Sequence, residues 1–398
     1  MITEDIMAVI LAAGESKRMW PLTLSRPKPL LPIFNEPLLL HTLRLLENRV
    51  NTAVIVVGYL ENHIRNVLGD RIHGISIEYV VQPQRLGTGN AILQAKGHLT
   101  RPFLVLMGDN LYSEEDVSAC MDPSLPYPCR MIAATSDHPE RFGVLLTEGS
   151  RVLDVIEKPT HFISHLVNNG LYLLTPEVVP LLEGLPLSDR GEIEITDLLS
   201  FLASKGKLGF NRVSRKLALT YPCDLLALHA TLGMEGKEWT VEGWIENGSV
   251  IQGPVHLGRN TLVRRGSHIE GPTWIGSDCE VGPHCVIRSC TCIGNHCNIG
   301  QSVEIRNSIL MDDVHIEPLC FIANSILGEG VIMEMGSFTA LETQTDLVIP
   351  PSLGTVLGDR AHTGAGTLLL PGSKLWPEIT TLPGERICSG MKKGGPIL

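Results

Sequence analysis

The sequence predicts an α/β protein in two parts: a domain with a mixed, mostly parallel sheet, followed by a parallel β-helix of hexapeptide repeats. Three observations support this prediction. Short apolar runs alternate with helix-length segments in the first half of the chain, and an aliphatic residue recurs at every sixth position in the second half. At 398 residues, the chain is also too long for one ordinary hydrophobic core.

The first half has the apolar runs of a sheet that is buried on both faces. Four runs are rich in Val, Ile and Leu: residues 7–13, 52–58, 75–81 and 102–109. Helix-length segments separate them: residues 36–50, 60–70 and 88–99. This alternation predicts an open parallel sheet. Ligands of such sheets bind outside the carboxyl ends of the strands, where the stretches AAGESKR and GDN fall.

The second half carries an internal repeat of six residues. Its aliphatic positions are Ile251, Leu257, Val263, Ile269, Ile275, Val281, Ile287, Ile293, Ile299 and Ile305. Mostly small residues precede them by two positions: Ser249, Val255, Thr261, Ser267, Thr273, Cys279, Cys285, Thr291, Cys297 and Val303. This pattern is typical of a parallel β-helix in which three hexads form one triangular coil.

The repeat also suggests where the domains end. Its phase breaks after Ile305 and resumes at Thr363, so residues 307–359 hold loops or a differently phased coil. The predicted domain boundaries are a first domain at 1–232, a linker at 233–247, the β-helix at 248–390 and a tail at 391–398.

Three cysteines of the small column have two interpretations. Cys279, Cys285 and Cys297 are either a stack of metal ligands or small apolar filler. We favour filler, because free cysteine is among the most often buried residue types. His284 and His296 precede two of these cysteines and are expected to point outward, toward solvent or an interface.

Composition and charge disfavour several classes of protein. The formal net charge of −11 makes nucleic acid a poor partner. No apolar run approaches the roughly 20 residues that a membrane span needs. The N-terminus lacks the basic region of a signal peptide. The ten cysteines include no CxxC pair, so neither a zinc knuckle nor a thioredoxin-type site is indicated. We expect a cytoplasmic protein with reduced thiols.

An anion site is predicted in the stretch LAAGESKRMWPLTLSRPKPLLPI, residues 11–33. The turn at Gly14 follows a strand and leaves backbone N–H groups for an anion, and Arg18 and Lys28 add positive charge. The whole string resembles the motif of sugar-1-phosphate nucleotidylyltransferases, which runs approximately LAAGxGxRxxPLTxxxPKxLxPI. Ser16 stands where that family usually has Gly, and Ser tolerates fewer backbone conformations.

Further segments resemble the same family, in the same order. Gln82 with LGTGNA at 86–91 looks like the base-recognition segment of members that use uridine or thymidine nucleotides. GDN at 108–110 looks like the segment with a magnesium-binding aspartate, Asp109. The later segments FGV, EKP and NNGLY look like those that bind the sugar and its phosphate, and RGEIEITD follows them. The substrate-binding residues that the resemblance implies are Leu11, Ala12, Ala13, Gly14, Gln82, Gly87, Thr88, Gly143, Glu157, Lys158 and Asn168.

The resemblance implies a Rossmann-like nucleotidyltransferase domain and a specific reaction. An oxygen of a sugar-1-phosphate attacks the α-phosphorus of a nucleoside triphosphate, and pyrophosphate leaves. Arg18 and Lys28 would be catalytic, with Arg18 on the pyrophosphate and Lys28 on the α-phosphate region. Lys158 would hold the sugar phosphate, and Asp109 would carry the cofactor Mg²⁺. Asp109 or Lys158 alone would be read as an ordinary turn residue, but the order of the motifs favours the functional interpretation.

A second metal-binding carboxylate is missing from its expected place. Family members often carry a segment like WxDxxxPxDLL, and this chain has KLALTYPCDLLAL at 216–228. The alignment puts Ala218 at the metal-ligand Asp and Lys216 at the Trp. Either Asp224 or Asp197 takes over, or the site has lost half of its protein charge.

The two-part layout resembles bifunctional proteins that join a nucleotidylyltransferase to a hexosamine-1-phosphate acetyltransferase with a left-handed β-helix. Their acetyltransferase segment uses a His as general base, but Pro318 stands at that position and Leu341 at that of an Asn. We therefore expect no acetyl transfer. The competing interpretation is that His315, or a group supplied by a neighbouring subunit, serves as the base. The resemblance also implies a homotrimer or higher homo-oligomer through the flat faces of the β-helix.

These observations predict a sugar-1-phosphate nucleotidylyltransferase that makes a UDP- or dTDP-sugar, with UDP-N-acetylglucosamine as one candidate product. The alternative is a catalytically weak sugar-nucleotide-binding or regulatory subunit of the same family. Arg18, Lys28 and Asp109 favour the enzyme, whereas Ser16 and Ala218 favour the binding subunit.

Overall fold

The computed structural model describes residues 6–188, 190–213, 217–233, 239–339, 353–388 and 390–392. The chain forms two compact units. The first comprises Met1–Glu15, Pro27–Leu30 and Leu38–Ala218. The second comprises Ser16–Arg26, Leu31–Pro37 and Leu219–Leu398. The domain boundaries predicted from the sequence stay predictions.

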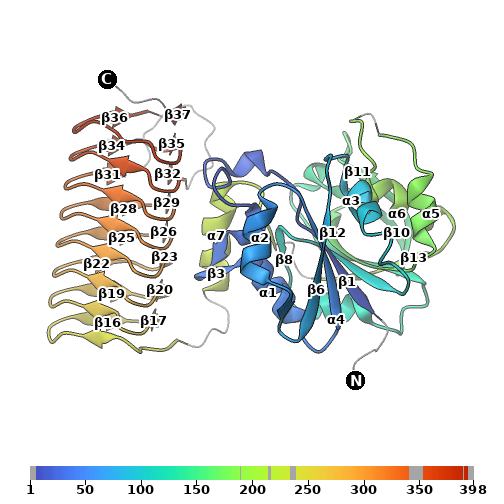
Figure 1. Cartoon of the computed structure of the whole chain (residues 1–398), viewed down its shortest axis with the longest axis horizontal. Helices are drawn as coiled ribbons and strands as arrows, with labels where there is room; N and C mark the ends of the chain where they lie inside the picture. The colour runs from blue at the N-terminus through green and yellow to red at the C-terminus, as the bar shows by residue number, and fades with distance from the viewer. Residues whose placement is uncertain are drawn as a thin grey trace. The chain divides into compact units, whose positions relative to one another are not determined.

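The first unit is built on a ten-stranded mixed sheet with the order β10-β11-β13-β9-β12-β7-β1-β4-β6-β5 (Figure 1). Its strands are β1 (Met7–Leu11), β4 (Thr52–Val57), β5 (Arg71–Ile72), β6 (Ile75–Val81), β7 (Phe103–Met107), β9 (Cys129–Thr135), β10 (Gly143–Glu148), β11 (Arg151–Glu157), β12 (Leu166–Leu174) and β13 (Leu208–Arg212). The four strands predicted from apolar runs are parallel neighbours, in the order β7-β1-β4-β6. Strand β12 runs antiparallel to β7, β9 and β10, so the predicted mixed α/β sheet is confirmed.

Helices cover both faces of this sheet. They are α1 (Leu38–Leu45), α2 (Glu61–Leu68), α3 (Thr88–Gln94), α4 (Glu114–Met121), α5 (Val178–Glu183) and α6 (Ile195–Ser204). Val9 and Leu11 of β1 share an apolar core with residues of α3, α5 and α6. Ala8 and Ile10 share a second core with residues of α1, α2 and α4. Strand β1 is apolar throughout because it is buried on both faces. Shorter elements complete the unit: η2 (Lys28–Leu30), β8 (Asn110–Leu111), η3 (Pro139–Arg141) and β14 (Leu217–Ala218).

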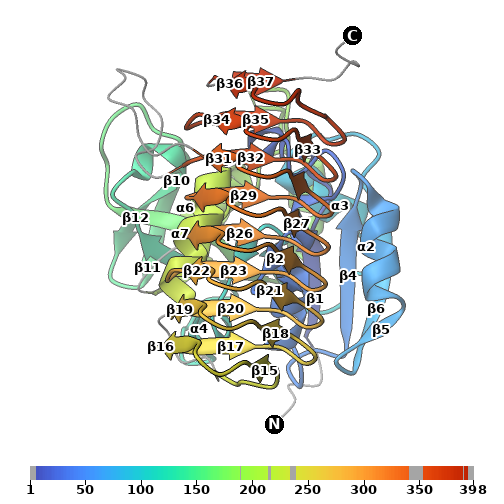
Figure 2. The ribbon, with the colours of Figure 1, turned by 90° about the vertical axis from the view of Figure 1, so that its left-hand side faces the viewer.

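The second unit contains the predicted β-helix, whose coils stack as three parallel sheets (Figures 1 and 2). The first sheet contains β15 (Trp244–Ile245), β18 (Leu262–Val263), β21 (Glu280–Val281), β24 (Asn298–Ile299), β27 (His315–Ile316), β30 (Ile332–Met333) and β33 (His362–Thr363). The second contains β16 (Val250–Gln252), β19 (His268–Glu270), β22 (Val286–Ile287), β25 (Glu304–Arg306), β28 (Phe321–Ala323), β31 (Phe338–Thr339), β34 (Leu368–Leu369) and β36 (Arg386–Ile387). The third contains β17 (Val255–Leu257), β20 (Thr273–Ile275), β23 (Thr291–Ile293), β26 (Ile309–Leu310), β29 (Ile326–Leu327), β32 (Val356–Leu357), β35 (Ser373–Leu375) and β37 (Gly390–Lys392).

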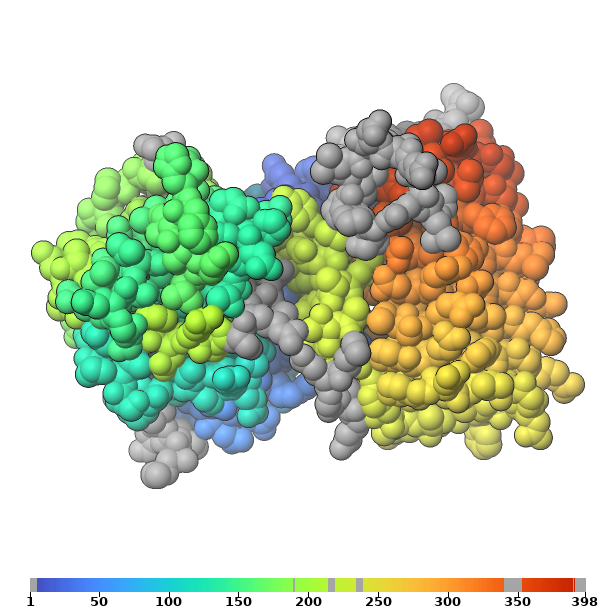
Figure 3. Space-filling model, turned by 180° about the vertical axis from the view of Figure 1, so that it is seen from behind, coloured from blue at the N-terminus to red at the C-terminus, as the bar shows by residue number. Residues whose placement is uncertain are grey.

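The colours of the β-helix pass from yellow to red along the stack in the space-filling view (Figure 3). Each coil therefore borders coils that are its neighbours in the sequence, as in other repeat architectures. The same unit also contains η1 (Lys17–Met19), β2 (Pro32–Ile33), β3 (Glu36–Pro37) and α7 (Pro222–Leu232). Among the described residues of the whole chain, no helix combines the length and hydrophobicity that a membrane crossing requires.

The interior of the β-helix is made by the residues of the hexad pattern. The aliphatic column is buried from Leu257 to Ile305. Cys279, Cys285 and Cys297 of the small column are free thiols with little exposed surface, which agrees with the filler interpretation. His284 and His296 are exposed at corners with left-handed backbone, φ 60° and 56°, so the expectation that they point outward is confirmed.

The break in the hexad phase is a change of coil length. Ile309 pairs with Cys292, so the coil is one residue shorter than the preceding ones, and regular coils continue to β31. The shortened corners are Asn307 and Asn324, both left-handed at φ 42° and 50°. Asn307 Nδ2 donates to Asn324 Oδ1 at 2.8 Å. Asn adopts this conformation more readily than most residues, so of the two expectations the differently phased coil holds for residues 309–339.

Candidate active site

The carboxyl ends of β1 and β7 bring the first two predicted motifs together. The two strands are parallel neighbours, and the backbone N–H of Gly108 donates to the carbonyl of Leu11 at 2.9 Å. A Cβ at position 108 would lie 2.9 Å from the same carbonyl oxygen, so this close approach requires glycine. The LAAG segment ending at Gly14 and the GDN segment therefore leave the sheet side by side, and both lie at carboxyl ends of strands, where the sequence predicts them.

An ion pair between Lys28 and Asp109 lies at this end of the sheet. Lys28 Nζ is 2.8 Å from Asp109 Oδ2. The lysine side chain is only 6% exposed, whereas the aspartate side chain is 36% exposed. A buried ammonium needs a paired negative charge, and Asp109 supplies it. The exposed side of the pair can receive an anion that takes over this role.

The backbone places position 218 beside the GDN segment. Strand β14 pairs antiparallel with β8, and Ala218 is the register partner of Asn110. The alignment that set Ala218 at the place of a second carboxylate is thus consistent with the backbone register. Lys216 lies outside the described residues.

The two carboxylates considered as replacements have other partners. Asp224 Oδ2 accepts hydrogen bonds from the backbone N–H groups of Thr220 and Tyr221, both at 2.7 Å, and so caps α7. Asp197 lies in the first turn of α6, where burial and then the charges of Glu194 and Glu157 raise its pKa. Asp224 is thus used for capping, while Asp197 belongs to a different cluster of charges.

The predicted base-recognition segment packs against the RGEIEITD segment. Gly87 has φ 96°, and a Cβ there would lie 2.5 Å from the carbonyl oxygen of Ile193. Thr88 Oγ1 accepts a hydrogen bond from the backbone N–H of Ile195 at 3.1 Å. Gln82 is buried, and its Nε2 donates to the carbonyl of Gly87 at 3.1 Å. These contacts fix Gln82 and the start of α3 in one rigid corner.

The NNGLY segment forms an irregular part of β12 next to the GDN segment. Asn168 Oδ1 accepts from the Gly170 N–H and from the Tyr172 hydroxyl, both at 2.9 Å. Burial raises the pKa of Tyr172, which keeps its hydroxyl as a donor. Asn110 Nδ2 donates to the carbonyl of Asn169 at 3.0 Å. The structure thus places Asn168 and Asp109 on directly connected segments.

A cluster of charges surrounds the EKP segment. Lys158 has φ 44°, and its Nζ lies 3.3 Å from Glu157 Oε1. Arg190 Nη2 lies 3.6 Å from the same oxygen and 2.6 Å from Glu194 Oε1. A Cβ at Gly143 would lie 3.3 Å from Glu157 Oε2, so glycine leaves room for this carboxylate.

The motifs of the sequence do not mark Arg190 or Glu194 of this cluster as site residues. Both belong to the RGEIEITD segment, and their i, i+4 spacing is a signal of an ion pair that could have identified them. Burial raises the pKa of Glu194, against the opposing effect of Arg190. The pair therefore shares Glu157 with Lys158, and the fold reveals this shared partner.

Arg18 belongs to the second unit. Its guanidinium carbon lies 5.9 Å from the centre of the Tyr221 ring. Ser16, which replaces the usual Gly of the motif, adopts the left-handed conformation with φ 53° and ψ 49°. Thr23 Oγ1 donates to the carbonyl of Ser16 at 3.0 Å. Ser16 therefore adopts a backbone conformation that is strained for serine and unstrained for glycine.

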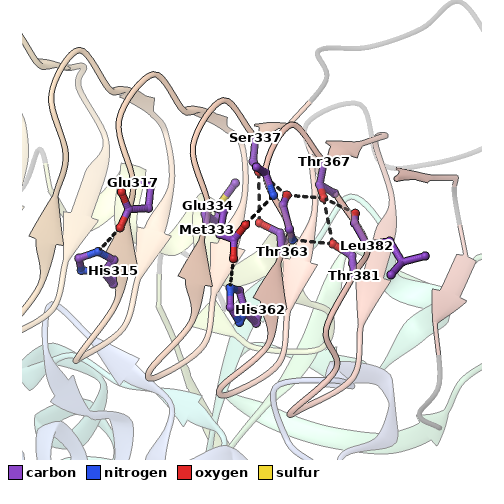
Figure 4. A network of polar contacts seen from close by, with 12 residues as sticks. His315, Glu317, Met333, Glu334, Ser337, His362, Thr363, Thr367, Thr381 and Leu382 are labelled. Atoms are coloured by element: carbon purple, nitrogen blue, oxygen red, sulfur yellow. Dashed lines mark hydrogen bonds and ion pairs between the residues drawn. The ribbon is translucent and has the colours of Figure 1, made fainter. Parts of the chain in front are cut away.

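The β-helix has two histidine–carboxylate pairs near the predicted acetyltransferase segment (Figure 4). His315 Nε2 lies 2.8 Å from Glu317 Oε1, and His362 Nε2 lies 2.9 Å from Glu334 Oε1. Pro318 follows the first pair at the place of the expected base. Leu341 lies outside the described residues.

Comparison with known proteins finds two family models that match consecutive parts of the chain. Residues 7–244 match the nucleotidyl transferase family model, and residues 245–345 match the model of the EIF2B subunit epsilon LbH domain, a left-handed β-helix. The bifunctional protein GlmU of Methanococcus maripaludis is 38% identical over 383 residues, which cover 92% of this chain and 91% of that protein. A UTP–glucose-1-phosphate uridylyltransferase of Haloferax volcanii is 30% identical over 207 residues, which cover 51% of this chain and 85% of that protein.

A solved structure agrees with the first part of the chain. It is a Bacillus anthracis protein assigned as a glucose-1-phosphate thymidylyltransferase, in complex with a sucrose, with a TM-score of 0.54 and 25% identity. The match covers 58% of this chain and 97% of that protein. Nucleotidyltransferases of this family generally use a divalent metal ion. The chain therefore belongs to the nucleotidyl transferase family, as a sugar-1-phosphate nucleotidyltransferase joined to a left-handed β-helix.

Proposed function

We propose that this enzyme makes a UDP- or dTDP-sugar and pyrophosphate from UTP or dTTP and a sugar-1-phosphate. The Lys28–Asp109 pair at the carboxyl ends of β1 and β7 is the observation that carries the proposal. It puts a buried cation and a more exposed carboxylate where ligands of such sheets bind. UDP-N-acetylglucosamine is one candidate product.

The reaction brings two polyanions together, so the protein acts mainly by positioning them and by neutralising charge. Lys28 would leave Asp109 and contact the α-phosphate, and Arg18 would hold the departing pyrophosphate. Lys158 would hold the sugar phosphate. Its side chain is 48% exposed, and Glu157 at 3.3 Å keeps it near the site until the substrate replaces that contact.

The base and the sugar would lie on rigid segments. Gln82, whose amide is fixed by Gly87, would face the pyrimidine base together with Thr88. Uridine and thymidine nucleotides are proposed because the segment resembles base-recognition segments of that specificity. The name of the Haloferax volcanii relative, which acts on UTP, supports this choice. Gly143 and Asn168 would line the sugar side.

Mg²⁺ is the proposed metal, with Asp109 as its protein ligand. The described residues contain no cluster of three His, Cys, Asp or Glu side chains that could hold a metal by themselves. One exposed carboxylate fits Mg²⁺ nonetheless, because this ion is often held by one or two carboxylates together with substrate phosphates. When bound, it would supply positive charge to the phosphates.

The β-helix is proposed to act as a scaffold that forms a cytoplasmic homotrimer or higher homo-oligomer and does not transfer acetyl groups. Pro318 has no side chain that accepts a proton, and a general base typically contributes about 10²–10⁴-fold to such a reaction. His315 is paired with Glu317 at 2.8 Å. Pro318→His alone is expected to restore nothing, because Leu341 remains at the place of the amide.

The test is pyrophosphate release by the purified chain with Mg²⁺, over a panel of nucleoside triphosphates and sugar-1-phosphates. We expect steady release with UTP or dTTP and at least one sugar phosphate. A second candidate function, a binding or regulatory subunit, is favoured by the alanine at position 218 beside Asn110. Nucleotide binding without pyrophosphate release from any pair would establish that candidate instead.

A further inference from the structure

The segment that carries Arg18 ends in a buried ion pair with the β-helix. Arg26 Nη2 lies 2.8 Å from Asp359 Oδ2 and 2.8 Å from Glu329 Oε2. Ser25 Oγ donates to the same oxygen of Asp359 at 2.6 Å. The side chains of Arg26 and Asp359 are 16% and 6% exposed. All of these residues, and the whole segment Ser16–Arg26, belong to the second unit.

Asp359 combines a structural role with this contact. Its Oδ1 accepts the backbone N–H of Glu329 at 3.0 Å. Asn295 and Asp312 act in the same way at corners of earlier coils, where Asn295 Oδ1 accepts from Ser277 N and Asp312 Oδ1 accepts from Asn295 N. The corner therefore needs only one oxygen, which an asparagine also provides. The second oxygen of Asp359 is the one that receives Arg26 and Ser25.

The charge of Asp359 is matched to Arg26. Burial alone would lower the pKa of the Arg26 guanidinium, but the charges and hydrogen bonds of Asp359 and Glu329 outweigh it and raise the pKa. A charge-assisted contact of this kind is stronger and more directional than a neutral hydrogen bond. Because the pair is shielded from water, it is also screened less by salt than an exposed pair.

The same segment is held at further points. Thr23 Oγ1 donates to the carbonyl of Ser16, which closes the turn around Arg18. Trp20 packs edge-on against Trp376 of the β-helix, with ring centres 6.0 Å apart. The backbone of Ser16 is left-handed, a conformation that a non-glycine residue keeps only when its surroundings impose it.

We infer that Arg26 and Asp359 are positioning residues for nucleotidyl transfer, through which the β-helix holds the Arg18 segment in its phosphate-binding conformation. The inference rests on the proposed function, because it assigns the effect to Arg18 as the group that holds pyrophosphate. It gives the β-helix a part in the reaction of the chain without requiring any second catalytic centre. Small displacements of a positioned group are costly, and about 1 Å can lower a rate by about 10²-fold.

The experiment compares Asp359→Asn with the matched control Asp312→Asn in the full-length chain. Both variants keep the corner acceptor, but only Asp359→Asn weakens the contact with Arg26. We expect Asp359→Asn to lower kcat/KM for the nucleoside triphosphate by about 10-fold or more, within the range for a mispositioned group. KM for the sugar-1-phosphate should stay unchanged in both variants, and Asp312→Asn should keep the wild-type kcat/KM.

A double-mutant cycle with Arg18→Ala separates positioning from general weakening of the fold. If Asp359 acts through Arg18, Asp359→Asn should cause no further loss of kcat/KM in the Arg18→Ala background. Equal losses in both backgrounds would overturn the inference. Arg26→Lys keeps the charge but cannot bridge two carboxylates in the same planar geometry, so it should show a smaller loss of the same kind.

Two results distinguish this inference from the proposed function. A wild-type chain that releases no pyrophosphate overturns the proposed function, and the inference falls with it. An active wild type whose Asp359→Asn and Arg26→Lys variants both match Asp312→Asn overturns the inference alone. Thermal unfolding of each variant, with assays well below the lowest midpoint, ensures that folded proteins are compared.

Discussion

The two units use their polar side chains in opposite ways. Inside the β-helix, Thr261, Ser267 and Cys285 donate to carbonyl groups of the next coil at 2.6, 2.8 and 3.0 Å. At the ends of the strands in the α/β unit, Lys28, Asp109 and Lys158 pair with other charged side chains instead. The hydroxyl and thiol groups inside the β-helix are bonded to backbone carbonyls of the repeat. The charged side chains of the α/β unit are bonded to other side chains, which a ligand can replace. The candidate chemistry of the α/β unit therefore lies where the regular hydrogen-bond pattern of its strands ends.

The largest expected effect on activity comes from changes to the Lys28–Asp109 ion pair. Lys28→Met keeps most of the side-chain volume and removes the cation, and Asp109→Asn removes the carboxylate. We expect each to lower kcat for pyrophosphate release by about 10²–10³-fold, as for the loss of one group that stabilises transition-state charge. Steady-state kinetics with saturating substrates measures this. A loss of less than about threefold in both variants would remove the pair from the mechanism.

In contrast to the changes at the charged pair, Ser267→Ala in the β-helix should lower the stability of the protein and leave its activity unchanged. Ser267 Oγ donates to the carbonyl of Gly282 and accepts from the N–H of Cys285, so Ser267→Ala leaves two buried groups without their partner. We expect a loss of about 1–3 kcal/mol in the free energy of unfolding. Chemical denaturation measures this loss of stability. We expect kcat for pyrophosphate release, measured in the same preparation, to stay unchanged. A Ser267→Ala variant with wild-type stability and a reduced kcat would contradict a purely structural role for Ser267.

A smaller effect is expected at Ser16, where the sequence departs from the glycine of the motif. Its left-handed conformation costs a non-glycine residue about 1–2 kcal/mol, and the greater freedom of glycine in the unfolded chain offsets part of this. Ser16→Gly should therefore raise the free energy of unfolding by up to about 1 kcal/mol. Denaturation curves of the two proteins provide the test, and a clear loss of stability would show that the serine side chain is itself required.

The smallest effect should come from Asp197, whose pKa is raised by burial and by Glu194 and Glu157. A raised carboxyl pKa means that the folded state binds the proton more tightly, so stability is lost as pH rises through that pKa. Asp197→Asn should therefore unfold at a higher temperature than wild type near pH 7. The difference should vanish below the ordinary pKa of about 3.9. A difference in unfolding temperature that grows toward acid pH would contradict a raised pKa of Asp197.

The sequence predicted much of the fold because its patterns are local. The apolar runs located β1, β4, β6 and β7, and the hexads from Leu257 to Ile305 identified the interior of the β-helix. The coils become shorter at Asn307 and Asn324, and the only sign of this in the sequence is that the six-residue repeat loses its phase. The sequence therefore could not distinguish a shorter corner from a loop.

The candidate site was predictable only where its residues belong to ordered motifs. Separate motifs contain Lys28 and Asp109, and the 2.8 Å contact between these residues depends on how distant segments meet. No motif identifies Arg190 as a site residue, because its role depends on Glu157, which is more than thirty positions away in the sequence. Asp359 carries no motif at all, and its contact with Arg26 arises from packing within the second unit.

The most direct test measures two reactions in one preparation of the intact chain. Pyrophosphate release is followed with UTP or dTTP, a sugar-1-phosphate and Mg²⁺, and thiol release is followed with acetyl-CoA and glucosamine-1-phosphate. We expect steady pyrophosphate release that is lost in Lys28→Met, and thiol release no faster than without protein. No pyrophosphate release from any substrate pair, or steady thiol release that disappears in His315→Ala, would contradict it.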